Sequence, residues 1–375
     1  MGGPSRGLRV LMSADTVGGV FHYAVELARQ LCRRGVKVAL ATMGAPLSPD
    51  QRRTLNDIQG LSVFESEFAL EWMPEPWQSV DEAGRWLLRI AEQFSAHVVH
   101  LNGYCHASLP WRAKVLLVAH SCVVSWSRAV RGTDPPPGFD RYRARVRDGL
   151  THADRVVAPS AAMLADLRAA YSFTGDARVI YNGIDWRERV PPQKQPFYLS
   201  AGRLWDEAKN LQLIAQVASE LPWPVRVAGD CPDVGRAPAL DWLGKLPRAQ
   251  LLSLMATSSI FLHPARYEPF GLAPLEAALS GAALVLGDIP SLREIWGASA
   301  CYVPPSEPAA LVAVARDLAQ DDARRRELAE RARKHARRYS AELMCREYLA
   351  SYRELLGETH SELALESPAI ALEAS

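Results

Sequence analysis

The chain has 375 residues, and a prior of about 150 residues per domain makes two domains the expected arrangement. Apolar residues make up 48% of it and charged residues 23%, which excludes an intrinsically disordered chain, and Gly and Pro are too few for a collagen-like or low-complexity protein. The 43 basic and 42 acidic residues leave a net charge of +1, which argues against a nucleic-acid-binding protein.

The cysteines and the apolar runs indicate the compartment in which the protein works. The six cysteines are scattered without a CxxC pair or a zinc-finger spacing, which fits a reducing compartment better than a disulfide-bonded secreted protein. The first apolar run, residues 8–12, is interrupted by Arg9 and is much shorter than the core of a signal peptide. Because longer apolar runs are broken by charges, Pro or Gly, we expect no transmembrane helix and a cytoplasmic location.

The N-terminal half alternates short apolar strands with amphipathic helices. Residues 8–12 predict a strand, the next loop ends in Gly18 and Gly19, and residues 20–34 predict a helix with apolar residues at every fourth position. A strand at 36–42 completes a β-α-β unit, which implies parallel strands. The remaining expected elements are strands at 97–101, 115–119 and 155–158 and helices at 86–94, 141–151 and 161–171.

The alternation starts again after an expected linker at Pro191 and Pro192. The expected elements are strands at 197–201, 225–228, 260–263 and 283–286, helices at 210–221, 249–257 and 274–280, and an arginine-rich helical region at 307–344. We therefore predict an α/β protein with two parallel-sheet units, residues 1–190 and 191–339, a further helix at 340–357 and a mobile acidic tail at 358–375. Ligands bind such sheets at the carboxyl ends of their strands, so a cleft between the two units is the expected site.

The strongest local signal is a pair of carboxylates, Glu268 and Glu276, which flank a predicted loop-to-helix junction. Pro274 suits the first turn of a helix, so Glu276 is expected in that turn and Glu268 in the loop before it. The positive helix end near Gly271 exposes backbone N–H groups that suit a phosphate or the hydroxyls of a sugar. The alternative is structural: Glu276 would complement the helix dipole, and Glu268 would be a surface loop residue.

Two cations, Arg203 and Lys209, follow the predicted strand 197–201. A bidentate guanidinium combined with an ammonium suits a diphosphate, although either group could instead form a surface ion pair with a neighbouring carboxylate. The loop with Gly18 and Gly19 lacks the GxGxxG dinucleotide fingerprint, but its glycines allow a ligand to approach the backbone closely.

In their order along the chain, these features resemble the retaining GT-B glycosyltransferases of glycosyltransferase family four, over residues 7–357. The resemblance also rests on ADRVVAPS at 153–160, NGID at 182–185 and Gly244. It implies two Rossmann-like domains facing a cleft, the first on the acceptor side, with a C-terminal helix that crosses back to the first domain. The implied activity is that of a retaining hexosyltransferase, which moves a sugar from a nucleotide-diphosphate donor to an acceptor; UDP is the commonest nucleotide in the family.

The resemblance also implies a role for individual side chains. Arg203 and Lys209 would bind the donor diphosphate and stabilise the leaving nucleotide. Glu276 would hold the hydroxyls of the donor ribose, Glu268 would contact the transferred sugar, and His120, at the end of the strand 115–119, would contact that sugar from the other domain.

Backbone groups would complete the implied donor site. The N–H groups of Phe270, Gly271 and Leu272 would surround the sugar and the phosphate, and Gly18 and Gly19 would approach the phosphate from the first domain. No metal and no further cofactor is expected, because the two cations oppose the charge that develops on the diphosphate and the sequence holds no D-x-D pair.

The partners and the competing functions follow from the same resemblance. The expected partners are a nucleotide-sugar donor and an acceptor that is a sugar, a lipid-linked sugar or a small molecule; nucleic acid is not expected, and nothing in the sequence supports membrane association. The alternatives are a non-catalytic nucleotide-sugar-binding protein and a nucleotide-sugar epimerase on the same fold. Turnover of bound donor would distinguish a transferase from a binding protein.

Overall fold

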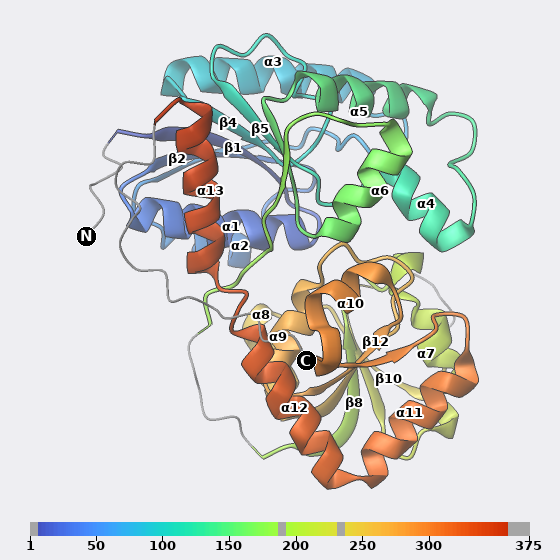
Figure 1. Ribbon diagram of the computed structural model, residues 1–375. Coiled ribbons are helices and arrows are strands. Elements are labelled where there is room, and N and C mark those ends of the chain that lie inside the picture. The colour runs from blue at the N-terminus through green and yellow to red at the C-terminus, as the bar shows by residue number, and fades with distance from the viewer. Residues whose placement is uncertain (1–6, 187–192, 231–236, 359–375) are drawn as a thin grey trace.

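The structure is a computed structural model that describes residues 7–186, 193–230 and 237–358. Its strands form two separate parallel sheets, and Figure 1 shows them in two lobes that are stacked one above the other. The expected linker prolines, Pro191 and Pro192, and residues 359–375 of the expected mobile tail lie outside the described residues.

The first sheet has seven strands in the order β3-β2-β1-β4-β5-β6-β7. The strands are β1 (Arg9–Asp15), β2 (Lys37–Met43), β3 (Leu61–Glu65), β4 (Val98–Leu101), β5 (Lys114–Val118), β6 (Arg155–Ala158) and β7 (Ala177–Val179). The helices are α1 (Gly19–Arg33), α2 (Pro49–Asn56), α3 (Trp77–Phe94), α4 (Val123–Arg131), α5 (Asp140–His152) and α6 (Ala161–Tyr171). The central strands are buried along almost their whole length because helices cover both faces of the sheet.

The second sheet has six strands in the order β10-β9-β8-β11-β12-β13. The strands are β8 (Gln195–Ala201), β9 (Val225–Ala228), β10 (Leu240–Gly244), β11 (Ser258–His263), β12 (Ala283–Gly287) and β13 (Cys301–Val303). The α-helices are α7 (Leu211–Val217), α8 (Arg248–Thr257), α9 (Leu272–Leu279), α10 (Pro290–Trp296), α11 (Pro308–Gln320) and α12 (Asp322–Ala336). Short 3-10 helices lie at η1 (Glu207–Lys209), η2 (Ala218–Glu220) and η3 (Gly297–Ser299).

The last described helix, α13 (Ala341–Leu355), crosses back to the first lobe and packs against α1 (Figure 1). Met344, Tyr348 and Tyr352 of this helix are buried in the same core as the inner face of α1. The two chain segments that connect the lobes run side by side, with a parallel bridge between Ile184 and Ser340. The expected fold, two Rossmann-like parallel-sheet lobes with a C-terminal crossover helix, is confirmed.

Several boundaries differ from the expectations. Strand β1 continues to Asp15, beyond the expected end at residue 12, because it stays paired with β2 through the polar residues of the expected loop. Helix α3 begins at Trp77 rather than near residue 86, since apolar residues spaced three or four apart are buried along its whole length. The expected helix 210–221 is shorter: α7 covers Leu211–Val217 and a 3-10 turn follows. Elements α2, β3, α4, β7, β10, α10 and β13 were not expected.

Candidate active site

The loop after β1 meets the loops after β8 and β11, which belong to the other lobe. Gly18, the N-cap of α1, has φ 110°, and a Cβ placed on it would lie 3.2 Å from Cδ of the Arg203 side chain. A Cβ on Gly19 would lie 3.7 Å from Cδ1 of Leu272, the first residue of α9. Both glycines therefore face residues that the sequence analysis placed in the donor site. Position 18 requires a glycine for two reasons: its positive φ, and the short distance between its backbone and the Arg203 side chain.

Arg203 lies in the loop between β8 and η1, next to a carboxylate. Its Nη2 is 3.4 Å from Oδ2 of Asp206, and its guanidinium lies 5.5 Å from the ring centre of Trp205. Asp206 is buried and also accepts a 3.0 Å hydrogen bond from Nε1 of Trp126, which belongs to the first lobe. The ion pair that the sequence offered as an alternative is thus present, yet the Arg203 side chain remains 38% exposed and faces Gly18.

Lys209 and Glu268 form a largely buried ion pair, which brings together two of the expected catalytic residues. Lys209 Nζ lies 2.7 Å from Glu268 Oε2, and the two side chains are only 15% and 14% exposed. The same carboxylate oxygen lies 3.1 Å from Nε2 of His263, the last residue of β11. Burial disfavours the ionised carboxyl, but Lys209 and the hydrogen bond from His263 outweigh it and hold the pKa of Glu268 well below its usual range. Glu268 is therefore a carboxylate at neutral pH.

His263 is a residue of the candidate site that the sequence analysis missed. Burial lowers its pKa, so the neutral imidazole donates its Nε2 proton to Glu268. A polar residue at the carboxyl end of a parallel strand, five positions before Glu268, was the signal that could have identified it.

Glu276 lies on α9 and is paired with Arg248, the first residue of α8. The Arg248 Nη2 to Glu276 Oε1 distance is 2.6 Å, and the Glu276 side chain is 9% exposed. Burial raises the pKa of Glu276, and the nearby guanidinium opposes that rise. The sequence analysis missed Arg248. It also placed Glu276 in the first turn of its helix, whereas Glu276 is the fifth residue of α9, because α9 begins at Leu272 rather than at Pro274.

The N-terminus of α9 lies between Glu268 and Glu276. Gly271 is its N-cap with φ 95°, and Phe270 before it is buried. The first N–H groups of a helix have no partner within the helix, so those of Gly271 and Leu272 point out of its positive end. Hydrogen bonds from Ser160 Oγ to Pro269 O (2.7 Å) and from Ser291 Oγ to the Glu268 carbonyl (2.6 Å) fix the preceding loop.

His120 follows β5 and is held by polar groups of the first lobe. Its Nε2 lies 2.8 Å from Oδ1 of Asn102, whose amide nitrogen donates a 2.6 Å hydrogen bond to Ser13 O. This second bond fixes the orientation of the Asn102 amide, so His120 carries its proton on Nε2 and leaves Nδ1 as an acceptor. Burial lowers the pKa of His120 to about 3. Two residues further on, Cys122 N donates to the hydroxyl of Tyr267, which directly precedes Glu268 (3.4 Å).

Asp15, at the carboxyl end of β1, is a third residue that the sequence analysis missed. Its Oδ1 accepts a hydrogen bond from Val17 N at 2.5 Å. Burial raises the pKa of Asp15 to about 6, although that amide and the charge of Arg203 favour the ionised form. A titratable carboxyl group of the first lobe therefore lies within the electrostatic reach of the cationic loop of the second.

Two family models match consecutive parts of the chain: "Glycosyltransferase Family 4" matches residues 17–188, and "Glycosyl transferases group 1" matches residues 184–335. The chain belongs to glycosyltransferase family 4. Its two lobes have the GT-B fold. Among the described residues of this glycosyltransferase, no helix has both the length and the apolar character needed to cross a membrane.

Individual relatives agree with this family. The chain is 36% identical over 97 residues to a glycogen synthase of Mycobacterium tuberculosis, a match that covers 25% of this chain and 23% of that enzyme. It is 25% identical to a 2-deoxystreptamine N-acetyl-D-glucosaminyltransferase of Streptomyces fradiae over 361 residues, with 83% and 85% of the two chains covered. Its fold is similar to that of Anabaena HepE, solved with UDP and glucose (TM-score 0.72, 17% identity, 92% of this chain and all of that chain covered).

Proposed function

We propose that this glycosyltransferase moves a sugar from a nucleotide-diphosphate donor, UDP-linked in the simplest case, to an acceptor, and that the sugar keeps its anomeric configuration. The observation that carries the proposal is the meeting of three groups at one place: Arg203, the Lys209–Glu268 pair and the N-terminus of α9, opposite the side-chain-free backbone of Gly18. HepE, which shares the fold, was solved with UDP and glucose.

The charges of this arrangement suit the breaking of a glycosyl–phosphate bond. As the bond breaks, positive charge develops on the sugar and negative charge on the departing diphosphate. Arg203 and Lys209 oppose the negative charge, and the positive end of α9 adds to their effect. The proposed step needs neither a metal ion nor a further cofactor, because these protein groups stabilise the leaving group.

Glu276 and Arg248 are suited to the nucleoside part of the donor. Arg248 occupies one oxygen of the Glu276 carboxylate, and the other oxygen can accept hydrogen bonds from the two hydroxyls of a ribose. Because Glu276 is buried, a pair of hydroxyl donors also relieves the cost of its ionisation.

The proposed retention does not run through a covalent intermediate on Glu268. A double displacement requires a carboxylate that attacks the sugar carbon and forms a glycosyl-enzyme intermediate. Glu268 is held by Lys209 and His263, which lower its basicity, so it is a weak nucleophile that instead orients a sugar hydroxyl. We infer that the acceptor hydroxyl attacks from the face that the diphosphate leaves, and that its proton passes to an oxygen of that diphosphate.

A donor screen tests this proposal. Thermal-shift and hydrolysis assays with UDP-, GDP- and ADP-sugars are run on the wild type, on Lys209→Ala and Glu276→Ala, and on a control, Lys245→Ala, an exposed lysine of the same lobe. One nucleotide class should stabilise the wild type and the control but not the two site variants. NMR of the methyl glycoside formed with methanol as acceptor then reports the anomer; an inverted product, or donor binding that survives both site variants, contradicts the proposal.

A further inference from the structure

Helix α10 of the second lobe lies against α6 of the first, where the two lobes face each other (Figure 1). Glu294, on α10, reaches the beginning of α6: its Oε1 accepts a 2.7 Å hydrogen bond from Ala161 N, and its Oε2 accepts a 2.9 Å hydrogen bond from Ala162 N. Ala161 and Ala162 are the first two residues of α6, and the first N–H groups of a helix have no acceptor within it. A carboxylate of one lobe therefore caps a helix of the other.

Charge and hydrogen bonds both favour a carboxylate at this position. The first turn of α6 contains no acidic residue, so Glu294 supplies the negative charge that the positive end of the helix favours. The hydroxyl of Tyr181, which lies in the first connection between the lobes, donates a further 2.9 Å hydrogen bond to Oε1. Three donors thus hold both oxygens of the half-buried Glu294 carboxylate in one orientation.

The same helix, α10, holds the loop that carries Glu268. Ser291, three residues before Glu294, donates a 2.6 Å hydrogen bond to the Glu268 carbonyl. From the first lobe, Ser160, the N-cap of α6, donates a 2.7 Å hydrogen bond to Pro269 O. The loop is therefore fixed by α10 on one side and by the start of α6 on the other, and Glu294 joins these two elements.

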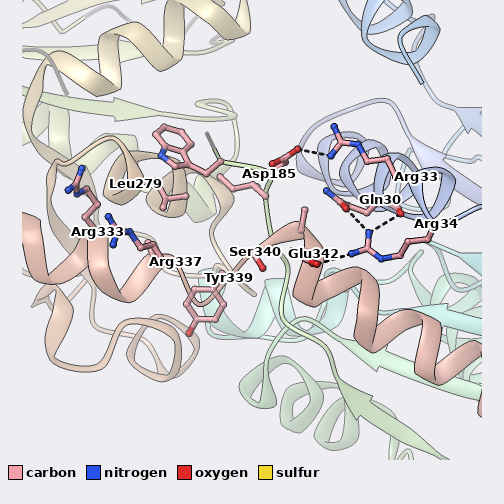
Figure 2. Close-up of a pocket in the computed structure, with 14 residues that line it drawn as sticks. Gln30, Arg33, Arg34, Asp185, Leu279, Arg333, Arg337, Tyr339, Ser340 and Glu342 are labelled. Atoms are coloured by element: carbon pink, nitrogen blue, oxygen red, sulfur yellow. Dashed lines mark hydrogen bonds and ion pairs between the residues drawn. The ribbon is translucent and has the colours of Figure 1, made fainter. Parts of the chain in front are cut away.

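The two connections between the lobes are tied to α1 of the first lobe. Asp185 pairs with Arg33 at 3.0 Å and Glu342 with Arg34 at 3.2 Å, both at the C-terminal end of α1 (Figure 2). These ion pairs are exposed to solvent, and exposed ion pairs contribute little to a fixed geometry. The orientation of the lobes therefore depends more on hydrogen bonds between their facing helices, such as those of Glu294 with α6.

We propose that Glu294 is a positioning residue: it caps α6 from the opposite lobe and thereby holds the lobes in the orientation in which Arg203 faces Gly18 and the loop of Glu268 is fixed. The role of Glu294 rests on the proposed function, since it concerns the assembly of that site. Glu294 acts through α6 and through Ser291, not through a contact with the donor.

Loss of this contact should affect turnover more than binding. The groups proposed to bind the nucleotide, Lys209 and Glu276 among them, lie in the second lobe and keep their own partners without Glu294. The reaction needs groups of both lobes, so its rate falls with the share of molecules in which the lobes are correctly oriented. Helix α4 keeps its 3.0 Å hydrogen bond from Trp126 Nε1 to Asp206 of the second lobe, so the lobes should stay in contact.

Two variants remove opposite halves of the contact. Proline is accepted at the first position of a helix, and Ser160 before it is extended (φ −158°, ψ 158°), so Ala161→Pro removes one N–H donor while α6 can still form. Glu294→Gln removes the charge and one of the two acceptor oxygens. Glu220→Gln, which changes an exposed glutamate of the second lobe, is the matched control. Melting temperatures show whether each variant is folded.

Three measurements on the full chain test the proposal: calorimetric titration with UDP, GDP and ADP, the initial rate of donor consumption, and hydrogen exchange of the segments 162–164 and 268–272. We expect Glu294→Gln and Ala161→Pro to lower kcat at least about tenfold and to leave the Kd of the nucleotide within about twofold of the wild type. Amide exchange should become faster in both segments. The double variant should be no slower than the slower single variant, because both changes remove one contact.

The proposal is wrong if both single variants turn over the donor as the wild type and Glu220→Gln do, or if nucleotide binding weakens as much as kcat falls. It is also wrong if exchange becomes faster only in 162–164, because Glu294 is then a local cap that does not fix the loop of the other lobe. Failure of the proposed function is recognised separately, since the wild type itself then binds no nucleotide or consumes no sugar donor. The exchange measurement needs no donor and still shows whether Glu294 holds the loop.

Discussion

Replacing Lys209 by Met separates the structural role of the Lys209–Glu268 pair from its role in the reaction. Removing one partner of a buried ion pair costs about 3–5 kcal/mol, because the other charge is left without compensation. Here His263 stays 3.1 Å from Glu268 and the carboxylate is 14% exposed, so we expect a smaller loss. A loss of about 2–3 kcal/mol corresponds to a fall of about 5–10 °C in the melting temperature of a lobe of this size.

The double variant Lys209→Met/Glu268→Gln removes the uncompensated charge as well. It should regain most of the lost melting temperature, because a neutral amide can still accept the hydrogen bond from His263. Its activity should stay about 10²–10³-fold below that of the wild type, since the leaving diphosphate has lost a cation. The assays are calorimetric melting and the initial rate of donor consumption, with the exposed Lys245→Met as control. Recovery of activity in the double variant would refute the proposed role of Lys209.

The same pair predicts how stability depends on pH. The folded-state pKa of Glu268 is depressed, so its contribution to stability is fully present above the ordinary glutamate pKa of 4.5. That contribution is lost as the pH falls from there toward the folded-state pKa. In Lys209→Met the depression is smaller, so the melting temperatures of variant and wild type should converge in acid and differ most at neutral pH.

Three further predictions concern the rest of the site. Gly18→Ala should lower kcat/KM for the donor more than the control Gly132→Ala does. Both glycines have positive φ, but only a Cβ at position 18 would lie 3.2 Å from the Arg203 side chain. Equal effects of the two variants in steady-state assays would contradict this prediction. Arg248→Ala should raise the pKa of Glu276 further, so the variant should lose stability relative to the wild type as the pH rises from 5 to 8, which melting curves would detect. Because the pKa of His120 is about 3, its titration should not affect the dependence of kcat/KM on pH between pH 5 and 8. Replacing His120 by Gln should therefore leave the shape of that pH profile unchanged.

The sequence predicted most of what depends on local pattern. The loop with Gly18 and Gly19, the cations after β8 and the carboxylates around α9 all follow the carboxyl ends of parallel strands, so the topology alone brings them to one region. The helix 161–171 and its N-cap Ser160 were predicted correctly, because the capping residue and the regular spacing of apolar residues can both be recognised within one short stretch of sequence.

The sequence did not predict what depends on contacts between distant elements. Arg248 pairs with Glu276 from a different helix, and His263 reaches Glu268 from the end of a strand. Neither pairing leaves a periodic signal, because the partner is chosen by the way two elements pack. Helix α4 was missed for a related reason, because its short segment mixes serine, arginine and tryptophan. It is positioned by contacts with the other lobe: Trp126 Nε1 donates a hydrogen bond to Asp206, and the Ser125 hydroxyl is hydrogen-bonded to that of Tyr267.

Each cation of the proposed donor site has a carboxylate of its own: Arg203 has Asp206, Lys209 has Glu268 and Arg248 has Glu276. The three carboxylates partly neutralise the positive charge of Arg203, Lys209 and Arg248, which would otherwise attract any anion. A single phosphate gains little by competing with one pair, whereas a nucleotide diphosphate with a ribose meets the cations, the helix terminus and the Glu276 carboxylate together. The carboxylates thus contribute to selectivity as well as to the positioning of the cations. Removing them should increase the affinity for simple phosphates before it abolishes binding of the donor.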